Sequence, residues 1–146
     1  MLRAWFDGCC EPKNPGGHAS FGAIMFRGEQ KILEEAGYCG FGPKMSNNVA
    51  EYSGICSILE YLQQEKEPCL ISGDSMLVIM HLQRKWRING GLYMPYYIKA
   101  RDLYEPIKDR IKLQWVSRDE NSICDVLSKG VLRARGIEFR IQREVA

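Results

Sequence analysis

The sequence has no long apolar run, few histidines and no paired cysteine motif. No stretch of about 18 apolar residues occurs, so no transmembrane helix is expected. Asp7 comes early, without a preceding apolar segment or small-residue cleavage site, so we expect no secretory signal and a location in the cytosol. The six cysteines form no C-x-x-C pair and no zinc-like spacing with the two histidines, and we expect small, buried, reduced side chains.

Neither sign of charge is in large excess, but the charges are unevenly distributed. The 146 residues carry a net charge of +2, and 45% hydrophobic with 26% charged residues is typical of one globular domain. Residues 1–83 contain ten acidic and six basic residues, whereas residues 84–118 contain three acidic and nine basic ones. This pattern is compatible with metal ions in one place and phosphates in another, although an ordinary solvated surface can produce it too.

The first part of the chain predicts a strand, a hairpin and a helix. Residues 2–6 should form a short apolar strand that ends at Asp7, followed by a turn-rich loop to about residue 18. Residues 19–26 and 31–39 are rich in β-forming side chains and flank a predicted turn. Ser46 can cap a helix to about residue 65, whose buried stripe should be Tyr52, Ile55, Cys56, Leu59 and Leu62.

The second part alternates strands and helices. Strands are predicted over residues 69–71 and 112–116, and helices over 75–85, 93–109 and from Asn121, as the cap, to about 135. Residues 137–141 alternate between apolar and polar side chains, which predicts an extra edge strand. This order predicts an α/β fold with a mixed sheet flanked by helices, and a purely parallel sheet is disfavoured because no helix separates the first three strands.

Four carboxylates fall where these elements should meet. Asp7 and Asp74 follow strands, and parallel neighbours open into one crevice at their carboxyl ends. Glu51 shares a helix face with apolar residues, and Asp125 lies near the apolar side of the last helix. Each acid alone is compatible with a turn or a helix-dipole role. Together they indicate a site for hard divalent cations, which take oxygen ligands and neutralise repulsion among clustered acids.

The segments around these acids resemble the motifs of the type 1 ribonuclease H family. Four segments are similar, in family order, to its four motifs: FDGCCEPKNPGG (6–17), SNNVAE (46–51), GDS (73–75) and WVSRDENSICD (115–125). The resemblance extends from residue 2 to about residue 132. It points to the archaeal, bacterial and retroelement subgroup that lacks a basic protrusion.

The resemblance implies a fold, a reaction and a cofactor. The fold would be a five-stranded mixed sheet with its first three strands antiparallel, over residues 1–135, with residues 136–146 as an extension packed on the same domain. The reaction would be endonucleolytic hydrolysis of the RNA strand of RNA/DNA hybrids by a monomer, leaving a 5′-phosphate and a 3′-hydroxyl, without membrane or organic cofactor. Two Mg²⁺ ions, replaceable by Mn²⁺, would be held by Asp7, Glu51, Asp74 and Asp125.

The family pattern also implies how the acids divide their work. Asp7 would bridge both ions. Glu51 and Asp74 would hold the ion nearer the leaving oxygen, and Asp125 the ion nearer the attacking water.

Substrate contacts follow from the same pattern. RNA is distinguished from DNA by its 2′-hydroxyls, and an asparagine offers both a donor and an acceptor to read them. The matching positions are Asn14, Asn47 and Asn48, with backbone groups near Cys10 and Glu11. Ser46 matches a position that contacts a DNA-strand phosphate in relatives. Asn14 is also typical of a turn before proline, and Asn47 of a helix start.

The chain departs from the family pattern at two places. Arg118 lies in the loop where many relatives carry a histidine, and because arginine stays charged, we expect it to assist through phosphate contact rather than proton transfer. The alternative is an ordinary surface arginine. The basic protrusion of some relatives is reduced, and Trp86 among cations could stack on the substrate or simply cover the core.

Other functions stay open. Exonucleases of the same fold usually begin with Asp-x-Glu, whereas this chain has Asp7-Gly8-Cys9. A junction resolvase would act as a dimer on branched DNA, and a non-catalytic hybrid-binding module would gain nothing from acids that repel a polyanion. The chain could also work as one domain of a reverse transcriptase or a larger machine.

Overall fold

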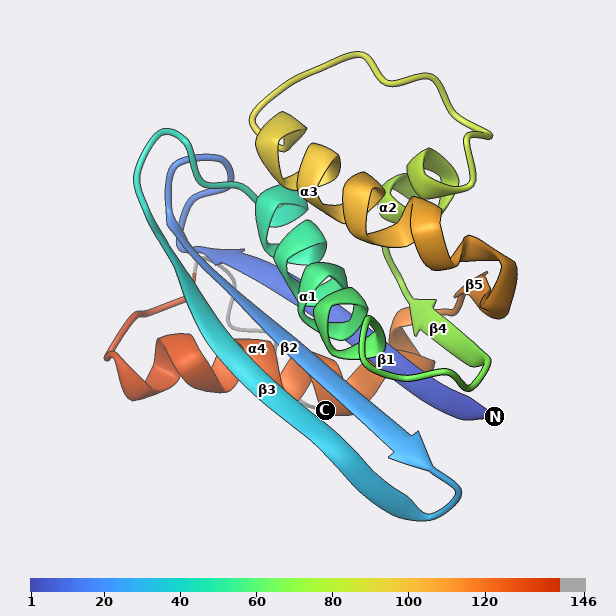
Figure 1. Ribbon diagram of the computed structural model, residues 1–146. Helices are drawn as coiled ribbons and strands as arrows, with labels where there is room; N and C mark the ends of the chain where they lie inside the picture. The colour runs from blue at the N-terminus through green and yellow to red at the C-terminus, as the bar shows by residue number, and fades with distance from the viewer. Residues whose placement is uncertain (140–146) are drawn as a thin grey trace.

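The first three strands form an antiparallel meander in the computed structural model, which describes residues 1–139 (Figure 1). β1 (Leu2–Glu11) pairs with β2 (His18–Arg27), and β2 pairs with β3 (Gln30–Phe41). β4 (Cys69–Gly73) then adds parallel to β1, and β5 (Ile111–Trp115) parallel to β4. The strand order is β3-β2-β1-β4-β5, so the predicted mixed sheet is confirmed and a purely parallel sheet is wrong.

The first strand is longer than predicted. Its apolar run ends at Phe6, and so does its pairing with β4, where Phe6 lies opposite Gly73. β1 continues to Glu11 because its other edge stays paired with β2 as far as His18. Asp7 therefore lies within a strand, at the point where one of its two neighbours ends, and not at the strand's own end.

Helices cover both faces of the sheet. α1 (Asn47–Leu62), α2 (Met76–Leu82) and α3 (Met94–Tyr104) lie on one face, and α4 (Ser122–Ala134) lies behind the sheet (Figure 1). Ser46 and Ser75 cap α1 and α2 by accepting from backbone N–H groups three residues on. No helix within residues 1–139 is long and apolar enough to cross a membrane.

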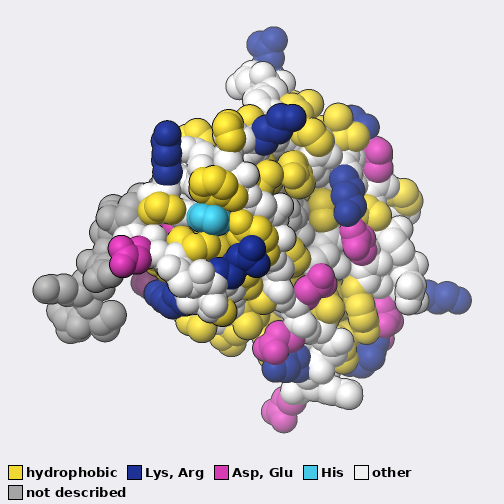
Figure 2. All heavy atoms as spheres, turned by 90° about the vertical axis from the view of Figure 1, so that its left-hand side faces the viewer, with side chains coloured by type: hydrophobic (Ala, Val, Ile, Leu, Met, Phe, Trp, Pro, Cys, Tyr) yellow, Lys and Arg dark blue, Asp and Glu magenta, His cyan; other side chains and the backbone are white. Residues whose placement is uncertain are grey.

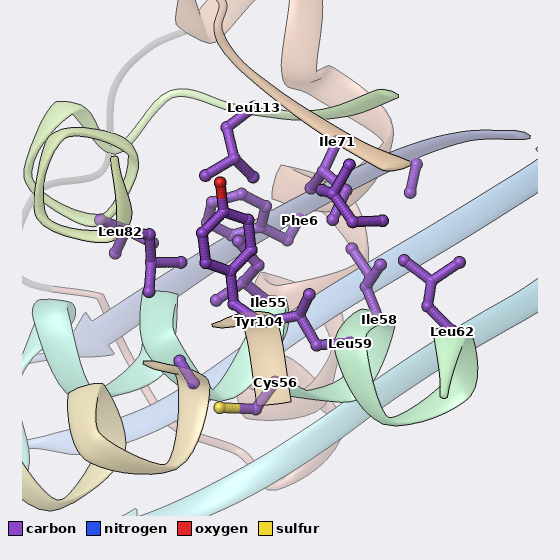
Figure 3. Close-up of a cluster of buried hydrophobic side chains, with 14 of the residues drawn as sticks. Phe6, Ile55, Cys56, Ile58, Leu59, Leu62, Ile71, Leu82, Tyr104 and Leu113 are labelled. Atoms are coloured by element: carbon purple, nitrogen blue, oxygen red, sulfur yellow. The ribbon is translucent and has the colours of Figure 1, made fainter. Parts of the chain in front are cut away.

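The core lies between α1 and the sheet, as the buried stripe predicted. The side chains of α1 point toward Phe6 on β1, Ile71 on β4 and Leu113 on β5 (Figure 3). All five predicted stripe residues are buried. Burial of each such side chain contributes about 1.5–3 kcal/mol, so this layer fixes α1 on β1.

The predicted end of the helix over residues 93–109 is wrong, whereas the predicted start of the last helix after Asn121 is confirmed. The helix predicted over residues 93–109 ends as α3 at Tyr104 and continues as the 3₁₀-helix η1 (Glu105–Arg110), because Pro106 lacks an N–H and crowds the preceding turn. Asn121 precedes α4 but makes no side-chain cap, and a second 3₁₀-helix, η2 (Arg118–Asn121), leads into α4.

The predicted C-terminal strand is absent from the described part of the chain. After α4, the N–H of Gly136 bonds to Arg133 and that of Ile137 to Leu132, with Gly136 at a φ of 75°. This helix ending turns residues 137–139 back toward α4 instead of along a sheet edge. The rest of the predicted strand lies outside the described residues, and the division of the chain at residue 135 stays a prediction.

Candidate active site

Asp7 and Asp74 lie where the parallel pairing of β1 with β4 ends. Asp7 comes directly after Phe6 and Asp74 directly after Gly73, and these two preceding residues are paired. Asp7 is 4% exposed, and the backbone N–H of Gly8 donates to its Oδ1 at 2.9 Å. The predicted crevice between the two carboxylates is thus formed, because the two strands separate after Phe6 and Gly73.

Glu51 reaches this pair because β1 and α1 approach very closely at Gly8. A Cβ atom on Gly8 would lie 2.5 Å from the carbonyl carbon of Ala50 and from the amide nitrogen of Glu51, so only glycine fits. Carboxylate oxygens of Asp7, Glu51 and Asp74 lie within 4.8 Å of one another. These three side chains are the acid cluster.

Burial and mutual repulsion disfavour the charged forms of the acid cluster. Burial, and then the charge of Asp74, raises the pKa of Asp7 to about 7. Burial, and then the charge of Asp7, raises the pKa of Glu51 well above its ordinary value. Burial also raises the pKa of Asp74, although the nearby Arg118 opposes this. The cluster is therefore costly to ionise without a cation.

One oxygen of the acid cluster has no protein partner. The Oε2 atom of Glu51 is buried without a hydrogen-bond partner among the described residues. Buried oxygens without partners are rare in folded proteins and call for an explanation such as a bound ion. Three carboxylates with one free buried oxygen have the chemistry that a hard divalent cation requires.

Asp125 faces the same cleft from α4, outside the acid cluster. α4 packs closely on β2 because a Cβ atom on Gly22 would lie 2.7 Å from the Cβ atom of Leu127. Lys129, one turn along α4, places its Nζ 3.0 Å from Oδ1 of Asp125. The charge of Asp125 adds to the factors that raise the pKa values of Asp7 and Asp74. The fourth predicted acid is therefore near the others, but it is paired with a lysine.

A cleft of about 750 Å³, here named the acidic cleft, joins all four acids to basic side chains. Its lining includes Arg118, Lys129 and Arg133. Acidic and basic side chains thus line one opening, an arrangement suited to metal ions and phosphates together.

The predicted substrate contacts fall into two groups. Cys10, Glu11 and Asn47 line the acidic cleft. Asn14 lies beside them, because its Oδ1 accepts from the backbone N–H of Asn47 at 2.9 Å.

The second group lies outside the lining of the acidic cleft. Ser46 caps α1 by accepting from Val49, and Asn48 is half-buried in the first turn of α1. Trp86 is 47% exposed beyond the end of α2. The role of these residues toward a substrate stays a prediction.

Several residues at this site were missed by sequence reasoning. Lys129 and Arg133 line the cleft, and the spacing of Lys129 four residues after Asp125 was an available signal. The Nδ2 of Asn121 donates to the carbonyl of Phe6 at 2.7 Å, and the indole N–H of Trp115 to the carbonyl of Asp74 at 3.1 Å. No sequence signal indicated that either side chain braces the backbone beside an acid.

Strand order 3-2-1-4-5, with a carboxylate cluster where β1 leaves β4, defines the ribonuclease H fold. Solved structures agree. The chain is similar to ribonuclease H1 of the halophilic archaeon Halobacterium salinarum NRC-1, with 26% identity, a TM-score of 0.78 and coverage of 91% of this chain and 98% of that one. It is also similar to LC11-ribonuclease H1 from compost, solved with an RNA/DNA hybrid, with 19% identity, a TM-score of 0.81 and coverage of 92% and 99%.

A third solved structure is similar over nearly the whole of both chains. The N-terminal ribonuclease H domain of a Mycobacterium tuberculosis protein gives 22% identity, a TM-score of 0.77 and coverage of 93% of this chain and 97% of that one. The chain belongs to the reverse transcriptase-like family, which it matches over residues 5–131. It is, at the level of that family and fold, a ribonuclease H-type hydrolase.

Proposed function

We propose that this protein hydrolyses the RNA strand of RNA/DNA hybrids with two divalent cations, Mg²⁺ or Mn²⁺, and leaves a 5′-phosphate and a 3′-hydroxyl. The observation that carries the proposal is the acid cluster, whose three carboxylates lie within 4.8 Å while one buried oxygen of Glu51 lacks a partner among residues 1–139. The hybrid bound by LC11-ribonuclease H1, which shares the fold, supports the choice of substrate.

The chain's own acids would hold the ions. The oxygens of Asp7, Glu51 and Asp74 lie closest to one another. The carboxylate of Asp125, on α4, becomes available to an ion when its ion pair with Lys129 breaks. Bound ions would activate a water molecule and stabilise the negative charge that develops on the phosphate. Asp7 would contribute to holding both ions, because its carboxylate lies within 4.8 Å of those of Glu51 and Asp74.

The remaining residues of the cleft bind and orient the strand. Arg118, Lys129 and Arg133 supply positive charge for phosphates. The backbone N–H of Asn47 holds the side-chain amide of Asn14 beside the acidic cleft, where hydroxyl groups of the cleaved strand would need partners. Burial of Asp7 and Glu51 excludes bulk water from the acids, which strengthens their attraction for cations.

A cleavage assay with an end-labelled hybrid tests the proposal. Wild type and Asp7→Asn are compared in Mg²⁺, Mn²⁺ or EDTA, beside single-stranded RNA, double-stranded RNA and a four-way DNA junction. We expect the RNA strand to be cut only with metal, and Asp7→Asn to lose at least about 100-fold in rate, since metal stabilisation contributes several kcal/mol.

Asp119→Asn is the matched control, because Asp119 is an exposed acid outside the lining of the acidic cleft. It should cut at the wild-type rate. Hybrid binding without cutting in either metal would support a non-catalytic binding module instead. Cutting of the junction but not of the hybrid would support a resolvase, and light scattering of the same sample tests the expected monomer.

A further inference from the structure

An apolar groove lies next to the acidic cleft, on the other side of the Asn14–Asn47 contact. It has a volume of about 430 Å³ and is lined by two loops, residues 13–16 and 41–43. Figure 2 shows this face of the molecule, where apolar side chains gather around a histidine with basic side chains among them. Of the residues in its lining, the reaction assigned to the acidic cleft uses Asn14, and it gives no role to Phe41 or Lys13.

Phe41 forms an exposed aromatic platform in the groove. Its side chain is 66% exposed, which is unusual for a phenylalanine. The ring of His18 lies against it, with the ring centroids 4.3 Å apart and the planes 33° apart. Nδ1 of His18 is 2.8 Å from the hydroxyl of Tyr38, which holds the imidazole in place. Phe41 is thus supported from one side and open on the other.

The two loops are tied to each other, so the groove is preformed. The backbone N–H of Gly16 donates to Met45 at 2.9 Å, and that of Gly42 to Gly17 at 3.2 Å. The aliphatic part of the Lys13 side chain lies along Gly16. A Cβ atom on Gly16 would be 3.5 Å from Cδ of Lys13. A rigid groove loses little conformational freedom when a ligand enters it.

The charge around the groove favours a polyanion. Lys13 is the charged residue among the described residues of its lining, and Lys44 follows Pro43 as an exposed cation. Arg135 adds a third positive charge, since its guanidinium lies 3.6 Å from the centroid of the Tyr38 ring beside His18. An aromatic platform flanked by cations is the combination that binds unpaired nucleotides. The base of any nucleotide can stack on the ring, and its phosphate can pair with a cation.

We propose that this groove binds an unpaired nucleotide of the RNA strand where that strand extends beyond the hybrid. This inference rests on the proposed function, because the strand in the acidic cleft is the one to be cut. Asn14 lines the groove and Asn47 the acidic cleft, so their hydrogen bond makes the two sites continuous along one strand. The base would stack on the free face of Phe41, with its phosphate near Lys13.

Fluorescence anisotropy in the Asp7→Asn background tests the groove without cleavage. A blunt hybrid of 12 base pairs is compared with hybrids carrying a four-nucleotide single-stranded extension of either RNA or DNA, at either end. An RNA extension at one of the two ends should tighten binding by about 5- to 30-fold. Phe41→Ala should abolish that gain, and Phe41→Trp should keep it.

Ile98→Ala is the matched control, since Ile98 is an exposed apolar side chain on α3 outside the groove lining. It should keep the full gain. The proposal is overturned if the RNA extension gives no gain, if the gain survives Phe41→Ala, or if DNA extensions give the same gain. It is also overturned if light scattering shows a dimer that Phe41→Ala dissociates, because a second copy would then occupy the groove.

The two proposals fail in different ways. If wild type does not cut the blunt hybrid, the proposed function fails. If wild type cuts the blunt hybrid but the extension adds nothing to binding, only the groove assignment fails.

Discussion

Asn121 joins η2 to the backbone of β1 immediately before Asp7. Its Nδ2 donates to the carbonyl of Phe6 at 2.7 Å, and the side chain is 2% exposed. A hydrogen bond from Asn121 also opposes the burial that raises the pKa of Asp74. Asn121→Ala leaves a buried carbonyl without a donor. We expect the free energy of unfolding to fall by about 1–3 kcal/mol, measured by urea denaturation.

The control for this prediction is Asn89→Ala. Asn89 is exposed in the loop before α3, and its loss should change the unfolding free energy by no more than about 0.5 kcal/mol. Equal stability of both variants would show that Asn121 does not brace β1.

The acids of the site could be predicted at the level of single residues, whereas the residues that contact or position them could not. Glu51 stood out because a carboxylate on an apolar helix face conflicts with burial, and Asp7 because it ends an apolar run. Asn121 matched a helix cap equally well, and Lys129 matched a surface lysine. Their roles depend on distances between α4, η2 and β1, which are set by packing and not by local sequence.

At the scale of elements, the distance between β1 and α1 controls the acid cluster. Gly8→Ala would place a Cβ 2.5 Å from the backbone of Ala50. Backbone atoms cannot rotate away from this clash as a flexible side chain could. We expect a loss of about 1–3 kcal/mol in unfolding free energy, because the helix must move, and a loss of hybrid cleavage, because Glu51 moves with it.

Gly130→Ala should change the free energy of unfolding in the opposite direction to Gly8→Ala. Gly130 lies within α4, and nothing is within 4 Å of the position that a Cβ would occupy. Alanine there should stabilise the protein by about 0.5–1 kcal/mol and leave cleavage unchanged. Denaturation curves of both variants, with cleavage rates, test the pair; a wild-type cleavage rate in Gly8→Ala would contradict the argument.

Element type was predictable here, but element ends were less so. The five strands and four α-helices follow from periodicity and from turn residues. The end of β1 could not be predicted, because it depends on which neighbour continues to pair, and the apolar run marks only the end of pairing with β4. The end of α3 at Pro106 was available from the sequence and was overlooked, since proline in a helix interior interrupts the hydrogen bonds.

At the scale of the whole molecule, the fold carries a localised electrostatic cost. The layer of apolar side chains between α1 and the sheet stabilises the protein (Figure 3). Asp7 and Glu51 lie on β1 and α1, the two elements that this layer joins, and both are buried. Stability and function therefore oppose each other at one place. A cation removes this conflict, so protein stability should depend on pH and on metal in a linked way.

The sign of that dependence follows from the pKa of Asp7, which is raised to about 7 from 3.8. Between about pH 4 and 7 the folded protein keeps a proton that the unfolded chain releases, so stability falls as pH rises. Without metal we expect a loss of about 1–4 kcal/mol across this interval. The raised pKa values of Glu51 and Asp74 act in the same direction.

Mg²⁺ should reverse the loss, since a ligand at 100 times its dissociation constant adds about 2.7 kcal/mol. Its effect should be larger at pH 8 than at pH 5, because protons compete with the cation for the same oxygens. Urea denaturation of wild type and Asp7→Asn at pH 5, 6, 7 and 8, in EDTA and in Mg²⁺, measures both effects. Asp7→Asn should show a flatter pH profile and a smaller response to Mg²⁺. A wild-type stability in EDTA that is constant from pH 5 to 8 would mean that the acids do not carry this cost, and would remove the physical reason for placing a cation among them.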